Sequence, residues 1–163
     1  MTLKRIILLL ILLAALPIAA FSLQPGSVFP PLPGTTLEGK LFNLGQLEPQ
    51  PILLTIGTTW CPGCRRLRGE IDKIRPFLAE QGIKYVEVFV NESEAKVRKY
   101  LSKGSHQSPD LVLLDKKIIS RALNVRMIPR VILIDKNFKV YQDGPPLSSA
   151  HLQQELLRMV EKE

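Results

Sequence analysis

The chain contains two cysteines, Cys61 and Cys64, and only two residues separate them. Such a pair can close a small disulfide or act as a dithiol, and the thiolate is the nucleophile in disulfide exchange. If Cys61 stands at the start of a helix, the unpaired backbone N–H groups there favour its thiolate. Cys64, one turn further along, is then placed to attack a mixed disulfide and release a substrate. Pro62 suits the first helical position, because its missing N–H would have no partner there.

The residues alone leave other uses of two thiols open. A purely structural disulfide is a weak alternative, because so small a loop constrains the unfolded chain little. Zinc usually takes four ligands, and the two histidines, His106 and His151, do not form a close-spaced pair. Copper delivery is the more credible metal alternative, since two thiolates can hold a soft ion, but no Met-rich or His-rich cluster in the sequence supports it. We therefore expect no metal and no cofactor beyond a redox-active Cys61–Cys64 disulfide.

The sequence around the cysteines predicts the elements that position them. The apolar run from Pro51 to Gly57 predicts a strand buried on both faces that ends shortly before Cys61. Apolar residues then recur at helical spacing, which predicts a helix that starts near Cys64. The stripe of this helix consists of Leu67, Ile71, Ile74 and Leu78.

Strands and helices alternate in the remainder of the chain, which closes with a hairpin and a helix. We predict strands over 83–90, 111–114 and 130–135, a short helix over 117–124, and a second hairpin strand over 138–141. Ser148 or Ser149 can cap the final helix. This order predicts an α/β fold with a central mixed sheet and helices on both faces.

The N-terminus has the layout of an export signal. Lys4 and Arg5 precede a continuously non-polar run over 6–21, and small residues follow. The run is slightly short for the roughly 20 residues that span a bilayer, so an uncleaved anchor is the alternative. Either reading places the domain outside the cytoplasm, in the periplasm or on the outer face of the cytoplasmic membrane. We predict a signal or anchor over 1–22, a Pro- and Gly-rich lead-in with a possible hairpin over 23–50, and one domain over 51–163.

The net charge of +7 does not indicate a nucleic-acid partner. The basic residues are mixed with Glu and Asp, and no Lys/Arg stripe with interleaved aromatic residues is present in the sequence.

After the signal, the chain resembles the thioredoxin superfamily, and within it the exported, often membrane-anchored thioredoxins of the TlpA and ResA type. The matching motifs are Trp60-Cys61-Pro62-Gly63-Cys64-Arg65, Val90-Asn91-Glu92-Ser93, and Met127-Ile128-Pro129 before the strand at 130–135. The resemblance implies a thioredoxin-like fold and a thiol:disulfide oxidoreductase with Cys61 and Cys64 as the catalytic pair.

The resemblance also implies roles for residues distant from the cysteines. Pro129 matches the family's cis-proline, which faces the disulfide and, with the backbone of Ile128, presents an edge for an extended peptide. Together with Trp60 it shapes the substrate groove. Glu92 aligns with an acid that assists proton movement at the buried cysteine, and it would replace the buried Asp that Thr55 displaces. The alternative for Glu92 is a solvated charge at a helix start.

Members of this group mostly reduce disulfides of exported proteins, including apocytochrome c before haem attachment. The implied partners are protein disulfides or dithiols and an upstream, membrane-bound thiol reductant. A peroxidase of the related redoxin group is disfavoured, because its reactive cysteine generally lacks a CxxC partner. Arg65, Arg66 and Arg130 are expected to surround the Cys61 thiol with positive charge, which would favour the thiolate.

Overall fold

The computed structural model describes residues 23–103 and 107–162. The predicted signal or anchor lies outside these residues. Within the described ranges, no helix is both long and apolar enough to cross a membrane.

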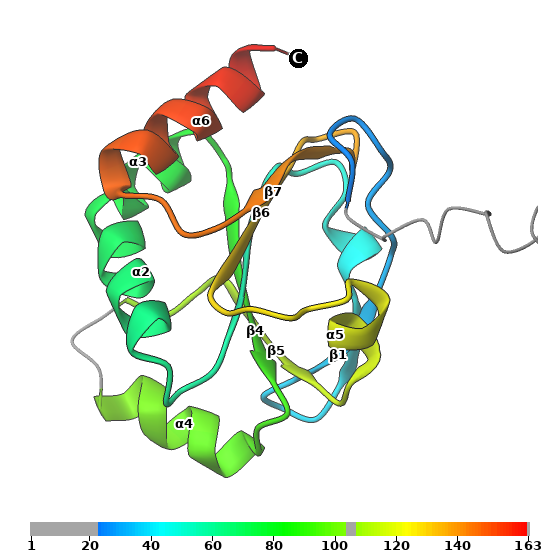
Figure 1. The fold of residues 1–163 in the computed structure, drawn as a ribbon, viewed down its shortest axis with the longest axis vertical. Coiled ribbons are helices and arrows are strands. Elements are labelled where there is room, and N and C mark those ends of the chain that lie inside the picture. Colours follow the sequence, from blue (N-terminus) through cyan, green and yellow to red (C-terminus); the bar gives the residue numbers. More distant parts are fainter. Residues whose placement is uncertain (1–22, 104–106, 163) are drawn as a thin grey trace, which may run out of the picture.

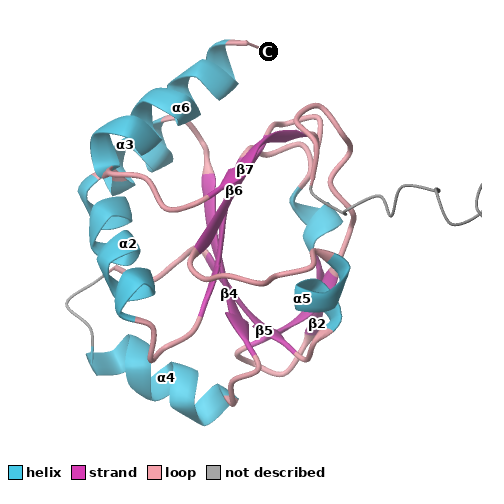
Figure 2. Ribbon diagram, in the orientation of Figure 1, coloured by secondary structure: helices cyan, strands magenta, loops and turns pink. Residues whose placement is uncertain are grey.

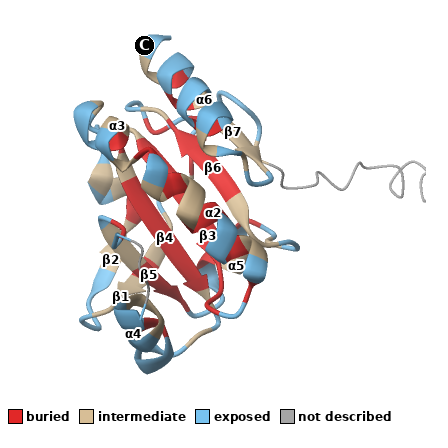
Figure 3. Cartoon of the chain, turned by 90° about the vertical axis from the view of Figure 1, so that its left-hand side faces the viewer, coloured by how far each residue is buried: buried red, intermediate tan, exposed pale blue. Residues whose placement is uncertain are grey.

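A seven-stranded mixed sheet forms the centre of the molecule, in the order β2-β1-β5-β4-β3-β6-β7 (Figures 1 and 2). The strands β3, β4 and β5 are parallel, while β6, β7, β1 and β2 run antiparallel to their neighbours. Strands β3 and β4 are mostly apolar and almost wholly buried, as expected for strands covered on both faces (Figure 3). The strand bounds are β1 Pro33–Thr36, β2 Leu41–Asn43, β3 Ile52–Gly57, β4 Lys84–Val90, β5 Leu111–Asp115, β6 Arg130–Ile134 and β7 Val140–Gly144.

Helices cover both faces of the sheet, which confirms the predicted thioredoxin-like α/β architecture. One face carries α2, α3, α4 and α6, and the other carries α5 with the N-terminal lead-in (Figure 1). The bounds are α2 Pro62–Lys73, α3 Arg75–Glu80, α4 Glu94–Lys103, α5 Ile118–Ala122 and α6 Ser149–Glu161, with a short 3-10 helix η1 over Leu44–Leu47.

Side-chain alternation along β4 divides the core between these two layers. Val86 and Val88 pack toward α5 and the lead-in, whereas Tyr85 packs against α2, α3 and α6. Phe89 belongs to the same face as Tyr85 and packs against α4. Glu87 shares that face, so a carboxylate lies between two apolar clusters beneath α2.

The lead-in over 23–50 is part of the same core. Strands β1 and β2 form an antiparallel pair, and β1 extends the sheet by pairing with β5. Phe29 is fully buried and contacts Phe138 edge to face, with ring centroids 5.6 Å apart.

Two of the differences from the predicted element boundaries have a clear physical cause. The helix predicted to continue through residue 78 is interrupted at Ile74, because Pro76 lacks the N–H that would bond to the preceding turn. Strand β7 starts at Val140 rather than at residue 138, because Phe138 occupies the turn with a positive φ of 57°. The final helix starts as predicted, with the hydroxyl of Ser148 accepting the N–H of His151.

Candidate active site

The Cys61–Cys64 pair lies where β3 passes into α2. Cys61 is the N-cap residue of α2, and its sulfur accepts the backbone N–H of Cys64 at 3.2 Å. Pro62 occupies the first helical turn. Both cysteines are free thiols and nearly buried, with 6% and 7% of their surface exposed. The N–H donor and the helix start both favour negative charge on Cys61.

Cys64 is the second thiol of the pair and lies within the first turn of α2. Burial, followed by the hydrogen bond with Cys61, raises the pKa of the Cys64 thiol to about 12. Gly57, the last residue of β3, allows the sulfur to lie this deep: a Cβ at Gly57 would be 2.8 Å from the Cys64 Sγ. Cys64 is therefore protonated at neutral pH in the reduced protein.

Pro129 lies against the cysteine pair from the other side of the site. The Ile128–Pro129 peptide bond is cis. A Cβ at Gly63 would be 3.1 Å from Pro129 Cδ and 3.8 Å from Cys61 Sγ, so these three residues are neighbours. The structure thus brings together two motifs that are more than 60 residues apart in the sequence.

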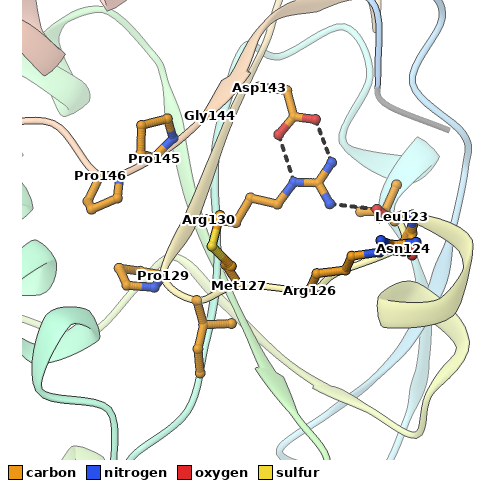
Figure 4. Close-up of a pocket in the computed structure, with 11 residues that line it drawn as sticks. Leu123, Asn124, Arg126, Met127, Pro129, Arg130, Asp143, Gly144, Pro145 and Pro146 are labelled. Atoms are coloured by element: carbon orange, nitrogen blue, oxygen red, sulfur yellow. Dashed lines mark hydrogen bonds and ion pairs between the residues drawn. The ribbon is translucent and has the colours of Figure 1, made fainter. Parts of the chain in front are cut away.

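An apolar groove of about 730 Å³ starts at Pro129. Its walls come from the loop between α5 and β6 and from the segment that ends β7 and continues into Pro145 and Pro146 (Figure 4). Met127, on the wall of the groove, is 82% exposed, and Trp60 beside Cys61 is 63% exposed. Both apolar side chains are therefore open to solvent.

Glu92 holds the loop that leads to Cys61. Its carboxylate accepts the N–H of Thr59 at 2.6 Å and the Thr59 hydroxyl at 2.7 Å. Lys96 pairs with the same carboxylate at 2.7 Å, and the Glu92 side chain is only 2% exposed. The alternative of a solvated helix-start charge is therefore wrong. The role of Glu92 in proton movement stays a prediction.

Arg130 does not contribute a free charge to the site. Its guanidinium makes a two-pronged ion pair with Asp143 on β7 and also donates to the carbonyl of Leu123 (Figure 4). The expected field of three arginines is thus wrong for Arg130, since a carboxylate compensates its charge. Arg65 and Arg66 remain, both exposed on α2.

Sequence reasoning missed a buried ion pair behind Cys64. Arg68 on α2 and Glu87 on β4 are 3% and 5% exposed, and their charged groups are 3.5 Å apart. The Tyr85 hydroxyl donates to Glu87 at 3.3 Å, and the Arg68 guanidinium lies 5.4 Å from the ring centroid of Tyr100. A glutamate within the otherwise apolar strand was the available signal.

The sequence of this chain is similar to those of known proteins. Residues 17–150 match the family described as Redoxin, which is most of the chain. The chain belongs to the Redoxin family. Its relatives include the thiol-disulfide oxidoreductase ResA of Geobacillus thermodenitrificans, 28% identical over 83% of this chain and 82% of the relative. The thiol:disulfide interchange protein DsbE of Yersinia pestis is 30% identical, over 86% of this chain and 76% of the relative.

Solved structures agree on the fold. A putative thiol:disulfide interchange protein DsbE from Chlorobium tepidum superposes with a TM-score of 0.75 at 22% identity, covering 85% of this chain and 99% of that structure. This Redoxin-family chain is a thiol:disulfide oxidoreductase with a CxxC pair. Over the described ranges, no group of three or more His, Cys, Asp and Glu side chains is arranged to hold a metal ion.

Proposed function

We propose that this protein reduces disulfide bonds of exported proteins outside the cytoplasm, with Cys61 as the attacking and Cys64 as the resolving cysteine. One observation carries the proposal: the two cysteines are about equally buried, but the Cys61 sulfur accepts an N–H at the start of α2 near the cis-proline, whereas the Cys64 sulfur lies against Gly57. The two sulfurs are therefore in unlike environments, as a two-step exchange requires.

The reaction runs in two exchanges. The Cys61 thiolate attacks a substrate disulfide, forms a mixed disulfide and releases one substrate sulfur as a thiolate. Cys64 then loses its proton and attacks the Cys61 sulfur. The mixed disulfide breaks, the second substrate thiolate leaves, and the protein retains a Cys61–Cys64 disulfide. Two electrons pass from the dithiol to the substrate, so a reductant must reset the pair.

The groove suits an extended peptide with apolar side chains. The ring of Pro129 lies beside Gly63 of the cysteine motif, and the apolar groove, which Ile128 also lines, continues from Pro129. We assign Trp60 to the other side of the cysteine, Pro62 to setting the first turn of α2, and Glu92 to holding the loop before it. No cofactor is needed for these steps.

The cellular setting proposed is the periplasm or the outer face of the cytoplasmic membrane. The basic start and the apolar run over 6–21 support an export signal or an anchor. A membrane-bound thiol donor is the proposed resetting partner, and the substrate class is the one handled in cytochrome c maturation.

Trapping tests the assignment of the two cysteines. Cys64→Ser should form stable mixed disulfides with a model disulfide peptide, whereas Cys61→Ser should neither reduce insulin nor trap a partner. The reverse pattern would refute these roles. The reduction potential in glutathione buffers tests the direction: we expect a value nearer the about −270 mV of thioredoxin than the about −120 mV of DsbA.

Copper delivery would use the same two sulfurs, since thiolates bind soft ions. Native mass spectrometry of the purified protein separates the two functions, because a chaperone retains metal and an exchange enzyme does not need it.

A further inference from the structure

We propose that Glu87 accepts the proton that Cys64 must lose before it can resolve the mixed disulfide. This inference rests on the proposed roles of Cys61 and Cys64, and it assigns a step that the cysteines cannot perform alone.

The proton needs an acceptor near a buried sulfur. Burial raises the pKa of the Cys64 thiol to about 12, so at neutral pH only a very small fraction of this thiol is ionised in the reduced protein. A thiol is a poor nucleophile, and the second exchange therefore requires proton removal at the moment of attack. Cys64 is 7% exposed, which restricts direct transfer to bulk water.

Glu87 and Cys64 line the same small cavity beneath α2. Thr55, Arg68 and Tyr85 also contribute to its wall. The cavity measures about 10 Å³, which corresponds to about one water molecule. The proton can pass from sulfur to carboxylate through one such molecule.

Strand pairing explains why a carboxylate is available at this depth. In the register of β3 and β4, Thr55 lies opposite Glu87, and both side chains are buried. Thr55 occupies the position at which cytoplasmic thioredoxins carry a buried Asp, so the sequence departs from them there. Here the buried acid lies one strand away, and it is joined to an arginine.

Arg68 makes the transfer possible without a change in buried charge. Before the transfer, its positive charge is balanced by the Glu87 carboxylate at 3.5 Å. Afterwards Glu87 is neutral, and the negative charge resides on the Cys64 sulfur in the same cavity. Because an unbalanced buried charge is costly, a step that only moves the anion between two neighbours of Arg68 costs less than one that creates an unpaired buried anion. The Arg68 Nε has no hydrogen-bond partner among the described residues, which leaves it available to the new anion.

The electrostatic effect of Glu87 separates two explanations. As a fixed negative charge it raises the pKa of the Cys64 thiol. If this were its only effect, Glu87→Gln would make Cys64 easier to ionise and would accelerate resolution. If Glu87 accepts the proton, the same substitution slows resolution.

Acid-quenched single-turnover reactions with a disulfide peptide measure the two exchanges separately. For Glu87→Gln at pH 7, we expect decay of the mixed disulfide to slow at least about 10-fold, since general base help is typically worth about 100-fold or more. Mixed-disulfide formation, which depends on Cys61, reports on the proposed function independently. Glu87→Asp should restore part of the rate, because it keeps a carboxylate.

Asp110→Asn is the matched control. Asp110 also pairs with an arginine, Arg75, which lies over the ring of Tyr85 near the start of β4, but neither Asp110 nor Arg75 lines the cavity of Glu87 and Cys64. Its removal should leave decay of the mixed disulfide within about 2-fold of wild type, so that a general loss of stability is separated from proton transfer.

Glu87→Gln leaves Arg68 buried without its carboxylate and can impair folding. The double variant Arg68→Met/Glu87→Met removes both charges and should fold, yet resolve as slowly. Acceleration, or slowing of less than 10-fold in the variants that fold, would overturn the proposal. So would a slow second step in Glu92→Gln with a normal one in Glu87→Gln.

Discussion

Thr59 and Glu92 are joined through both oxygens of one carboxylate. The backbone N–H of Thr59 donates to Oε2 at 2.6 Å, and its hydroxyl donates to Oε1 at 2.7 Å. These bonds connect the loop that precedes Cys61 to the loop that follows β4. Because Thr59 is two residues before Cys61, the Glu92 carboxylate fixes the backbone that leads into α2.

Replacing Glu92 by Ala should therefore destabilise the protein more than replacing it by Gln. Ala leaves the Thr59 N–H without its acceptor, and hydrogen bonds to charged groups are worth about 1.5–3 kcal/mol each. A Gln amide can accept the N–H and donate to the hydroxyl. Urea unfolding should give a loss of about 2–3 kcal/mol for Ala and less than about half of that for Gln. Equal losses would show that the carboxylate geometry is unimportant.

Gly57 should not tolerate even a methyl group. A Cβ there would be 2.8 Å from Cys64 Sγ, so Gly57→Ala must displace the sulfur or the strand. Overpacking of this kind typically costs about 1–3 kcal/mol. We expect a lower thermal midpoint and slower decay of mixed disulfides. Gly39→Ala is the comparison for altered glycine content, since nothing lies within 4 Å of a Cβ at that surface turn, although its φ of +77° adds local strain.

Arg130 should contribute to stability and not to thiol reactivity. Its partner Asp143 has a side chain only 9% exposed, so Arg130→Thr leaves a carboxylate nearly buried and unpaired. We expect a loss of about 2–4 kcal/mol in urea unfolding, largely recovered in the double variant Arg130→Thr/Asp143→Asn. The rate of Cys61 alkylation by iodoacetamide should be unchanged. Slower alkylation in Arg130→Thr would instead support the field of three arginines expected from the sequence.

Stability of the reduced protein should fall at alkaline pH. Burial is the larger cause and the hydrogen bond with Cys61 the next, and together they raise the pKa of the Cys64 thiol to about 12. The pKa of a cysteine in the unfolded chain is about 8.5. The stabilising contribution is therefore complete below about pH 8.5 and is lost as the pH rises toward 12.

The oxidised protein is the control, because it has no thiol to titrate. Urea unfolding of both forms at about pH 8 and about pH 10 should show a larger loss for the reduced form. An equal loss in both forms would indicate that groups other than Cys64 dominate.

The sequence alone determined the chemistry and the order of elements. The spacing of Cys61 and Cys64 after an apolar strand predicted both the reactive pair and its place at a helix start, because these are local properties of the chain. Alternating apolar runs likewise predicted the mixed sheet, which the structure confirms. The interruption at Ile74 was missed, because the apolar residues keep helical spacing on both sides of Pro76.

Only the tertiary structure decided which polar groups meet. The contact of Gly63 with Pro129, the pairing of Arg130 with Asp143 and the burial of Glu92 each join segments distant in the sequence. Glu87 looked like one polar residue within an apolar strand, and nothing local indicated that α2 would place Arg68 and Cys64 over it. Periodicity along one element predicts which face is buried, whereas the partner of a buried charge depends on how the helices pack over the sheet.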